Sequence, residues 1–377
     1  MIMDDAFIID FASAPPPERH FEPVVRDRRR GRAATANPDG RFEPVTREHF
    51  DDGWDIDDEL PTLATEVQVE KVKTIITRNT SPDVPFERSI NPYRGCEHGC
   101  IYCFARPTHG FMGLSAGLDF ETKLFAKPDA PRQLARELAK PGYKARTIAI
   151  GTNTDPYQPV EKTWRIMRQT LEVLAEANHP VSITTKSALV LRDLDILSAM
   201  AEKHLVKVMV SVTTLDRKLA RAMEPRAATP PRRLETIRTL SEHGIPVGIS
   251  VAPVVPALTD HEIERILDSG KAAGAREASY ILLRLPLEVA PLFKDWLLEH
   301  HPERYRHVMS LIRSMRGGKD YDAEFGKRMK GSGPYAWQIA RRFELAVKRL
   351  GLARRGGALR EDLFVPPDGA GTQLNLF

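Results

Sequence analysis

The chain has 377 residues, of which 42% are hydrophobic and 28% are charged, and its formal net charge is +4. This composition is typical of a soluble globular protein, and no apolar run approaches the roughly 18 to 20 residues of a membrane span. The mild positive charge permits a nucleic-acid partner without requiring one. The N-terminus begins with acidic rather than basic residues, which argues against a signal peptide. The odd, low cysteine count argues against a disulfide framework, so we expect the protein to reside in the reducing cytoplasm.

Residues 1–65 show weak apolar periodicity, with a basic run at 26–32 and an acidic run at 51–59. We predict an extension that is mostly disordered or wrapped on the surface. The sequence FEPV-x-R occurs twice, at 21–26 and 42–47. Two copies are too few for a solenoid, and the sequence offers no physical reason for the repetition.

Short β-branched runs alternate with amphipathic stretches over residues 66–300. This alternation is typical of parallel strands joined by helices, which close into a full or partial barrel with ligands at the carboxyl ends of the strands. The predicted strands lie near 86–91, 147–152, 181–186, 207–212, 247–253 and 278–285.

Two connecting stretches have apolar residues at helical spacing. The first places Trp164, Met167, Leu171 and Leu174 on one face, and the second does the same with Leu234, Ile237 and Leu240. Gly244 can close the second helix in a left-handed cap, and Thr259 with Glu262 matches a capping box that begins another helix. We expect a helical region over 301–365 and a flexible tail over 366–377.

The cysteines of the chain are Cys96, Cys100 and Cys103, at the spacing C-x-x-x-C-x-x-C after the first predicted strand. A disulfide would leave one thiol over. Zinc would need His98 or His109 as a fourth ligand, although structural zinc sites usually come as two separated pairs. A 4Fe–4S cluster normally takes four thiolates, so three would leave one iron open for a substrate or cofactor.

This spacing, with Tyr102 directly before the third cysteine, resembles the signature of the radical S-adenosylmethionine (SAM) enzymes. The resemblance implies a partial (β/α)6 barrel and a 4Fe–4S cluster whose open iron is chelated by SAM. It also implies reductive cleavage of SAM to a 5′-deoxyadenosyl radical, with an electron donor such as flavodoxin or ferredoxin.

Residues 85–290 further resemble the spore photoproduct lyase group, described as DNA repair photolyase-like, in the segments GTNTDPYQP, ITTKS, VSVTT, MEPR and SVAPV. This likeness implies contacts to SAM from Tyr102, Thr154, Asp155, Lys186, Ser211 and Ala252, with Lys186 and Asp155 also placed among the catalytic residues. A strand-end lysine can pair with the SAM carboxylate, and a serine can bond its ribose or carboxylate.

Plainer roles stay open for several of these residues. Lys186 can be a solvated strand-end lysine, and Ser211 a small residue of the barrel core. Asp155 and Glu161 can favour a helix N-terminus. Arg94 and Arg106, which flank the cysteines, can stabilise an anionic cluster, bind phosphate or lie on the surface.

Two positions depart from the lyase pattern. Thr152 stands where the lyase has a hydrogen-returning cysteine, and Phe104 stands where it has a tyrosine. The sequence therefore favours SAM cleavage but not spore photoproduct reversal. We predict a radical SAM enzyme acting on damaged or modified DNA bases; the alternatives are an RNA, peptide or small-molecule substrate, or a non-catalytic metal-stabilised nucleic-acid-binding protein.

The chain ends in QLNLF, which resembles the bacterial sliding-clamp-binding pentapeptide. Leu374, Leu376 and Phe377 can enter an apolar pocket while Gln373 makes an orienting hydrogen bond. A clamp is therefore a predicted partner, and a C-terminus docked on its own domain is the alternative.

Overall fold

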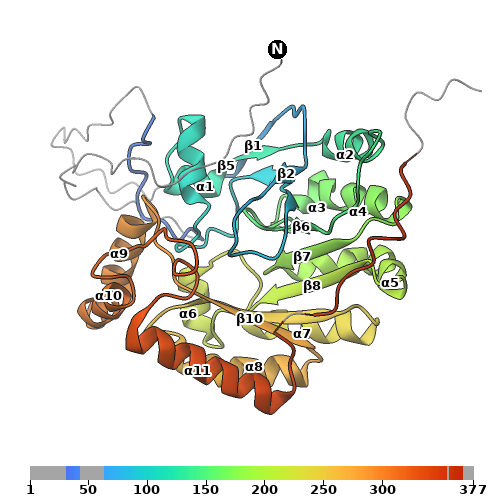
Figure 1. Cartoon of the computed structure of the whole chain (residues 1–377). Helices are drawn as coiled ribbons and strands as arrows, with labels where there is room; N and C mark the ends of the chain where they lie inside the picture. Colours follow the sequence, from blue (N-terminus) through green and yellow to red (C-terminus); the bar gives the residue numbers. More distant parts are fainter. Residues whose placement is uncertain (1–30, 43–62, 355, 368–377) are drawn as a thin grey trace, which may run out of the picture.

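The computed structural model describes residues 31–42, 63–354 and 356–367. They form a larger and a smaller sheet, with helices packed around the larger one (Figure 1). The strands of the larger sheet are β2 (Thr77–Arg78), β3 (Arg88–Ile90), β6 (Ile148–Ile150), β7 (Val181–Thr185), β8 (Val206–Ser211), β9 (Val247–Val254) and β10 (Glu277–Leu282). The smaller sheet contains β1 (Glu66–Val69), β4 (Tyr93–Arg94) and β5 (Lys123–Ala126). Within the described ranges, no helix has the length and apolar character needed to cross a membrane.

The larger sheet has the strand order β10-β9-β8-β7-β6-β3-β2. Its strands from β3 to β10 run parallel, and β2 pairs antiparallel with β3 at the edge. The six predicted strands are thus confirmed, and so is the partial barrel, because the sheet does not close on itself. Parallel strands buried on both faces need continuous β-branched runs, which is why the sequence pattern located them.

The helices that follow the strands cover the outer face of the sheet. They are α2 (Ala130–Leu138), α3 (Glu161–Trp164), α4 (Ile166–Glu176), α5 (Leu194–Glu202), α7 (Pro230–Glu242) and α8 (Ile263–Ala272). The short helix α6 (Arg217–Met223), which follows β8, packs instead against the loop at 100–102, where the N–H of Ile101 donates to the carbonyl of Met223. Leu171 and Leu174 of α4 are fully buried in the main core, and each such side chain contributes roughly 1.5–3 kcal/mol. Trp164 does not share their helix, because Arg165 adopts a left-handed conformation (φ 51°) that separates α3 from α4.

Two predicted helix caps have different outcomes. Gly244 has φ 73° and follows α7, and the N–H of Ile245 donates to the carbonyl of Leu240, so the left-handed cap is confirmed. The capping box at Thr259 and Glu262 is wrong. The hydroxyl of Thr259 accepts from the N–H of Val255, and the carboxylate of Glu262 is taken by the loop that follows β8.

The inner face of the sheet carries small hydroxyl side chains. Ser211, Ser250 and Ser279 lie side by side in register on β8, β9 and β10. The hydroxyl of Ser279 donates to Ser250 over 3.0 Å. On the opposite face, Ile249 packs against Gly270 of α8. A Cβ atom on Gly270 would lie 2.5 Å from the side chain of Ile249. The barrel interior is therefore small and polar, whereas the outer face forms the apolar core.

After β10 the chain forms α9 (Val289–His300), α10 (Tyr305–Ser314) and α11 (Gly333–Leu350), and α11 packs against α8. Residues 327–332, which we expected to be helical, are not part of a helix. We call residues 324–331 the strap, because they join the two edges of the open sheet. The N–H of Leu282 in β10 donates to Met329 over 2.9 Å. At the other edge, Asp83 in the β2–β3 hairpin accepts from the N–H of Gly326 and pairs with Arg328.

Part of the N-terminal extension is packed into the fold. Ala33 and Ala34 are almost fully buried. Ala36 packs closely against Gly117, because a Cβ atom on Gly117 would lie 2.1 Å from the carbonyl oxygen of Ala36. Surface wrapping is therefore wrong for these residues. Both predicted runs and both FEPV copies lie wholly or largely outside the described residues, as does the QLNLF tail.

Candidate active site

The cysteine loop begins directly after β4 and lies near the carboxyl end of β3. Cys96 and Cys100 are buried, Cys103 is partly buried, and all three are free thiols. The N–H of Gly99 donates to the carbonyl of Cys96, and that of Cys103 donates to the carbonyl of Cys100, each over 3.1 Å. Gly99 has φ 63°, and a Cβ atom there would lie 2.7 Å from a carboxylate oxygen of Glu121. The loop is therefore tightly wound, and a glycine is needed between the first two cysteines.

A buried ion pair holds this loop together. Arg106 and Glu121 are fully buried, and their charged atoms lie 2.6 Å apart. The guanidinium of Arg106 also donates to four carbonyls of the surrounding loops. These are the carbonyls of Gly99, Cys100, Ala116 and Gly117. Glu121 further accepts the N–H groups of Ala33 and Ala34, which ties the N-terminal segment to the cysteine loop.

Neither flanking arginine is free to bind phosphate. Arg106 is wholly occupied inside the loop, so phosphate binding and a surface position are wrong for it. Its charge opposes the effect of burial on the pKa of Cys103, and stabilisation of an anionic cluster stays a prediction. Arg94 forms a forked pair with Glu70, with nitrogen–oxygen distances of 2.8 to 3.0 Å.

Burial raises the pKa of all three cysteine thiols. The nearby Cys103 raises the pKa of Cys96 and of Cys100 further, and Asp155 and Cys100 also raise that of Cys96. Backbone groups oppose this effect, because Asp155 hydrogen-bonds Cys96, and Ala105 and Arg106 hydrogen-bond Cys103. Such bonds stabilise thiolates, which are the form that binds metal. Three neighbouring thiols, two of them buried and two of them receiving backbone hydrogen bonds, fit the ligand set of an iron–sulfur cluster.

The histidines weighed as zinc ligands have other partners. Nδ1 of His98 lies 3.4 Å from Asp155, and Nε2 of His109 lies 2.9 Å from the carbonyl of Lys123. In the part of the chain that the structure describes, no three His, Cys, Asp or Glu side chains are grouped so as to hold a metal ion. A four-iron cluster is larger than one ion, and its thiolates stand further apart than the ligands of a single zinc.

Asp155 is a hydrogen-bond centre between the cysteine loop and β7. Its carboxylate accepts from the hydroxyl of Thr185, the N–H of Lys186 and the N–H of Tyr157 over 2.7 to 2.9 Å. Burial would raise its pKa, but His98 and these hydrogen bonds outweigh burial and lower the pKa to about 2. The side chain of Asp155 is thus a fixed anion that positions the end of β7, and these partners already use the hydrogen-bonding capacity of its carboxylate.

Lys186 is the cation that faces the thiols. Its ammonium lies 5.8 Å from the centre of the Tyr102 ring. Burial raises the pKa of Cys100 and Cys103, and the charge of Lys186 works against that rise. No described residue forms an ion pair with this ammonium. Lys186 therefore lies beside the cysteines with a charge that no described residue neutralises. A lysine that binds a carboxylate needs such an available charge.

The other predicted SAM contacts lie around the same strand ends. Ser211 is buried at the end of β8, and the carbonyl of Ala252 on β9 accepts from Thr213 over 3.2 Å. Thr154 is buried, and its hydroxyl donates to the carbonyl of Tyr93, so this hydroxyl is not free. The hydroxyl of Tyr102 bonds a carboxylate, which holds its ring beside Lys186.

That carboxylate belongs to Glu224, which sequence analysis did not select. Glu224 is buried, accepts from Tyr102 and Thr213, and pairs with the buried Arg233. Arg233 also donates to the carbonyl of Ser211. The signal available was the segment MEPR, which contains Glu224 and was noted only for its likeness.

Glu161 was also underestimated as a simple capping residue. It is fully buried, caps the N–H of Met167 at the start of α4, bonds the hydroxyl of Tyr93 and pairs with Arg192 over 2.7 Å. It therefore joins the strand before the cysteines to two helical segments.

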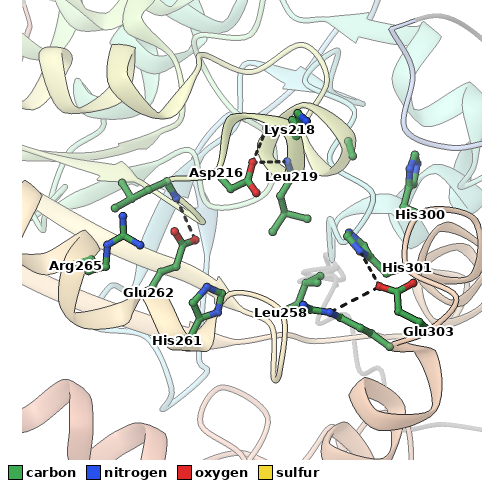
Figure 2. A pocket seen from close by; sticks show the side chains of 13 residues that line it. Asp216, Lys218, Leu219, Leu258, His261, Glu262, Arg265, His300, His301 and Glu303 are labelled. Atoms are coloured by element: carbon green, nitrogen blue, oxygen red, sulfur yellow. Dashed lines mark hydrogen bonds and ion pairs between the residues drawn. The ribbon is translucent and has the colours of Figure 1, made fainter.

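A separate cavity of about 650 Å³ lies near α6 and the start of α8 and does not include the cysteines (Figure 2). Its acids are already engaged. Asp216 caps α6, Glu262 bonds the loop after β8, and Glu303 lies 3.8 Å from both His301 and Arg304. The cavity therefore lacks the donor set that defines the cysteine site.

Comparison with known proteins agrees with this geometry. The model of the Radical SAM superfamily matches residues 90–270. An uncharacterized protein of Mycobacterium tuberculosis (strain H37Rv) is 38% identical over 230 residues, covering 60% of this chain and 68% of that protein. The Radical SAM Nalpha-GlyT isomerase of Pseudomonas phage M6 is 24% identical over 233 residues, covering 60% of this chain and 46% of the isomerase.

Among solved structures, spore photoproduct lyase complexed with dinucleoside spore photoproduct matches with a TM-score of 0.55 and 15% identity, over 76% of this chain and 81% of the lyase. At that identity the match shows a shared fold. The family model, which matches residues 90–270, places the chain in the Radical SAM superfamily.

Proposed function

We propose that the chain is an enzyme that binds a 4Fe–4S cluster and SAM and acts on damaged or modified DNA bases. The observation that carries the chemistry is the placement of three neighbouring thiols, two of them buried, beside the ammonium of Lys186, which pairs with no described residue. When bound, a cluster held by three thiolates supplies the electron that cleaves SAM to a 5′-deoxyadenosyl radical.

The chain's own residues bind and orient in this proposal. Cys96, Cys100 and Cys103 hold the cluster, and Lys186 pairs with the carboxylate of SAM. Asp155 fixes the backbone of Lys186, so its proposed role is positioning rather than proton transfer. The buried walls of the loop exclude water, which would otherwise compete with the substrate for the radical.

Further SAM contacts are proposed at Tyr102, Ser211 and Ala252. Tyr102 is held by Glu224, and Ser211 has a hydroxyl on the inner face of the sheet. Ala252 stays a proposed contact to the adenine. Thr154 is the weakest of the proposed contacts, because its hydroxyl already donates to a backbone carbonyl.

A DNA substrate is supported by the fold shared with a lyase solved with a dinucleoside photoproduct. The reaction is proposed to end differently from that lyase reaction, because Thr152 and Phe104 offer neither a thiol nor a phenol. The flavodoxin or ferredoxin donor, the sliding clamp and the cytoplasmic location stay predictions.

The experiment is anaerobic reconstitution with iron and sulfide, followed by reduction with SAM and candidate substrates. We expect ultraviolet-damaged or alkylated DNA to stimulate formation of 5′-deoxyadenosine above the level with undamaged DNA. Stimulation by RNA or peptide alone would reject the DNA substrate while leaving SAM cleavage in place. Zinc in place of iron would favour the non-catalytic alternative.

A further inference from the structure

Arg284 lies two residues beyond β10, at the carboxyl edge of the sheet where the cysteine loop also lies. Its guanidinium is 4.9 Å from the centre of the Phe104 ring. Phe104 directly follows Cys103 and is 41% exposed. Arg284 therefore stands beside the cysteine loop, at a surface that a substrate can reach.

The hydrogen-bonding capacity of Arg284 is largely unused. Its Nε is buried without a partner. Its two terminal nitrogens have only long contacts of 3.5 Å, to the sulfur of Met329 and the hydroxyl of Tyr321. Arg284 forms no ion pair with any described residue. A buried donor without a partner is costly, so its presence calls for an explanation.

A second arginine increases the positive charge at this place. Arg316 is buried, and its guanidinium donates to the carbonyls of Leu283 and Lys327 over 2.9 and 2.7 Å. It too has no ion pair within the described ranges. Burial lowers the pKa of Arg316, Tyr321 and Asp322 oppose this effect, and the charge of Arg284 lowers the pKa further, so Asp322 is the carboxylate that partly offsets the two cations. The nearby Asp320 is already paired with Lys294 and Arg313.

The strap holds this arrangement at the open side of the sheet. Met329, whose sulfur contacts Arg284, is fixed to β10 by its carbonyl. Structural support alone does not require a guanidinium here, because contacts of 3.5 Å to a thioether and a phenol are weak. The cavity of Figure 2 is a poorer anion site, because Lys218 and Arg265, which form no ion pair with a described residue, are exposed to solvent.

We propose that Arg284 binds a backbone phosphate of the nucleic-acid substrate and thereby places a base beside the cysteine loop. The inference rests on the proposed function, because it takes the substrate to be a nucleic acid. The planar fork of the two terminal nitrogens, whose present contacts to a thioether and a phenol are weak, matches two phosphate oxygens, and such bonds are among the strongest that arginine makes. Phe104 keeps the guanidinium plane in place through its ring face.

The test measures binding of a fluorescein-labelled single-stranded DNA of about eight nucleotides by fluorescence polarisation, over a range of salt concentrations. Arg284→Gln should weaken binding about tenfold or more and lower the salt slope by roughly 0.7, the value for one lost phosphate contact on a single strand. The matched control is Arg238→Gln, which removes an exposed arginine from α7 and should change affinity less than about twofold.

The inference would be overturned if the wild type and Arg284→Gln bound equally well, or if Arg284→Gln and Arg238→Gln lost affinity equally. Either result would leave the DNA substrate standing. Failure of the wild type to bind the DNA at all would instead reject the nucleic-acid substrate itself. Should Arg284→Gln fail to fold in a thermal melt, Arg284→Lys carries the test. It keeps the charge but loses the fork, and a loss of about threefold or more is expected.

Discussion

Replacing Glu121 by glutamine tests whether the buried ion pair with Arg106 organises the cysteine loop. The substitution keeps the size of the side chain and removes its charge, which leaves the guanidinium of Arg106 buried without a counter-ion. Both side chains are fully buried, so solvent cannot compensate. Breaking a buried pair on one side costs about 3–5 kcal/mol of unfolding free energy.

The matched control is Glu235→Gln on α7. Glu235 and Arg238 form a pair with the same nitrogen–oxygen distance of 2.6 Å as the buried pair, but their side chains are 44% and 52% exposed. An exposed pair contributes at most about 1 kcal/mol. The two pairs therefore match in ion-pair distance and differ in burial and in the two backbone N–H groups that Glu121 also accepts.

The assay is urea unfolding of the metal-free protein, followed by measurement of iron bound after reconstitution. Glu121→Gln should lower the urea midpoint strongly, lower the melting temperature in a parallel thermal melt by roughly 4–6 °C and reduce iron binding. Glu235→Gln should change neither appreciably. Equal small effects in both variants would show that the buried pair does not hold the loop and would refute the reasoning.

Three further predictions concern the site and the core. Asp155→Asn should lower iron and SAM binding, because the amide NH2, whichever way it lies, faces the backbone N–H of either Tyr157 or Lys186; normal iron content would contradict the positioning role. Lys186→Met should weaken SAM binding about tenfold in equilibrium dialysis of the reconstituted protein, whereas equal affinity would remove Lys186 from the SAM site. Burial lowers the pKa of His179 to about 4, below its unfolded value near 6.5, so the stability it contributes above pH 6.5 is lost as pH falls toward 4. The loss should be about 3 kcal/mol, and His179→Phe should flatten this part of a stability-against-pH curve; an unchanged curve would contradict the assignment.

The parts of the fold that repeat a local pattern could be predicted from sequence. Each parallel strand is buried on both faces, so its β-branched run is visible without knowledge of its neighbours. The convergence of Lys186 and the cysteines at one edge followed from the same topology, because parallel strands end on one side. The cap at Gly244 was predictable because its signal is local.

Features that depend on distant partners could not be predicted. Thr259 and Glu262 have the spacing of a capping box, but Thr214 and the N–H of Leu215 compete for Glu262 and win. The burial of Ala34 depends on Glu121, which lies 87 positions away in the chain. The strap likewise joins elements that only the folded sheet brings together.

The central claim is tested most directly by reducing the reconstituted protein with SAM under anaerobic conditions and measuring 5′-deoxyadenosine. The wild type should produce it, and Cys100→Ala should not, because two thiolates do not retain the cluster. Absence of 5′-deoxyadenosine from wild-type protein fully loaded with iron and sulfide, under a strong reductant, would contradict the radical mechanism.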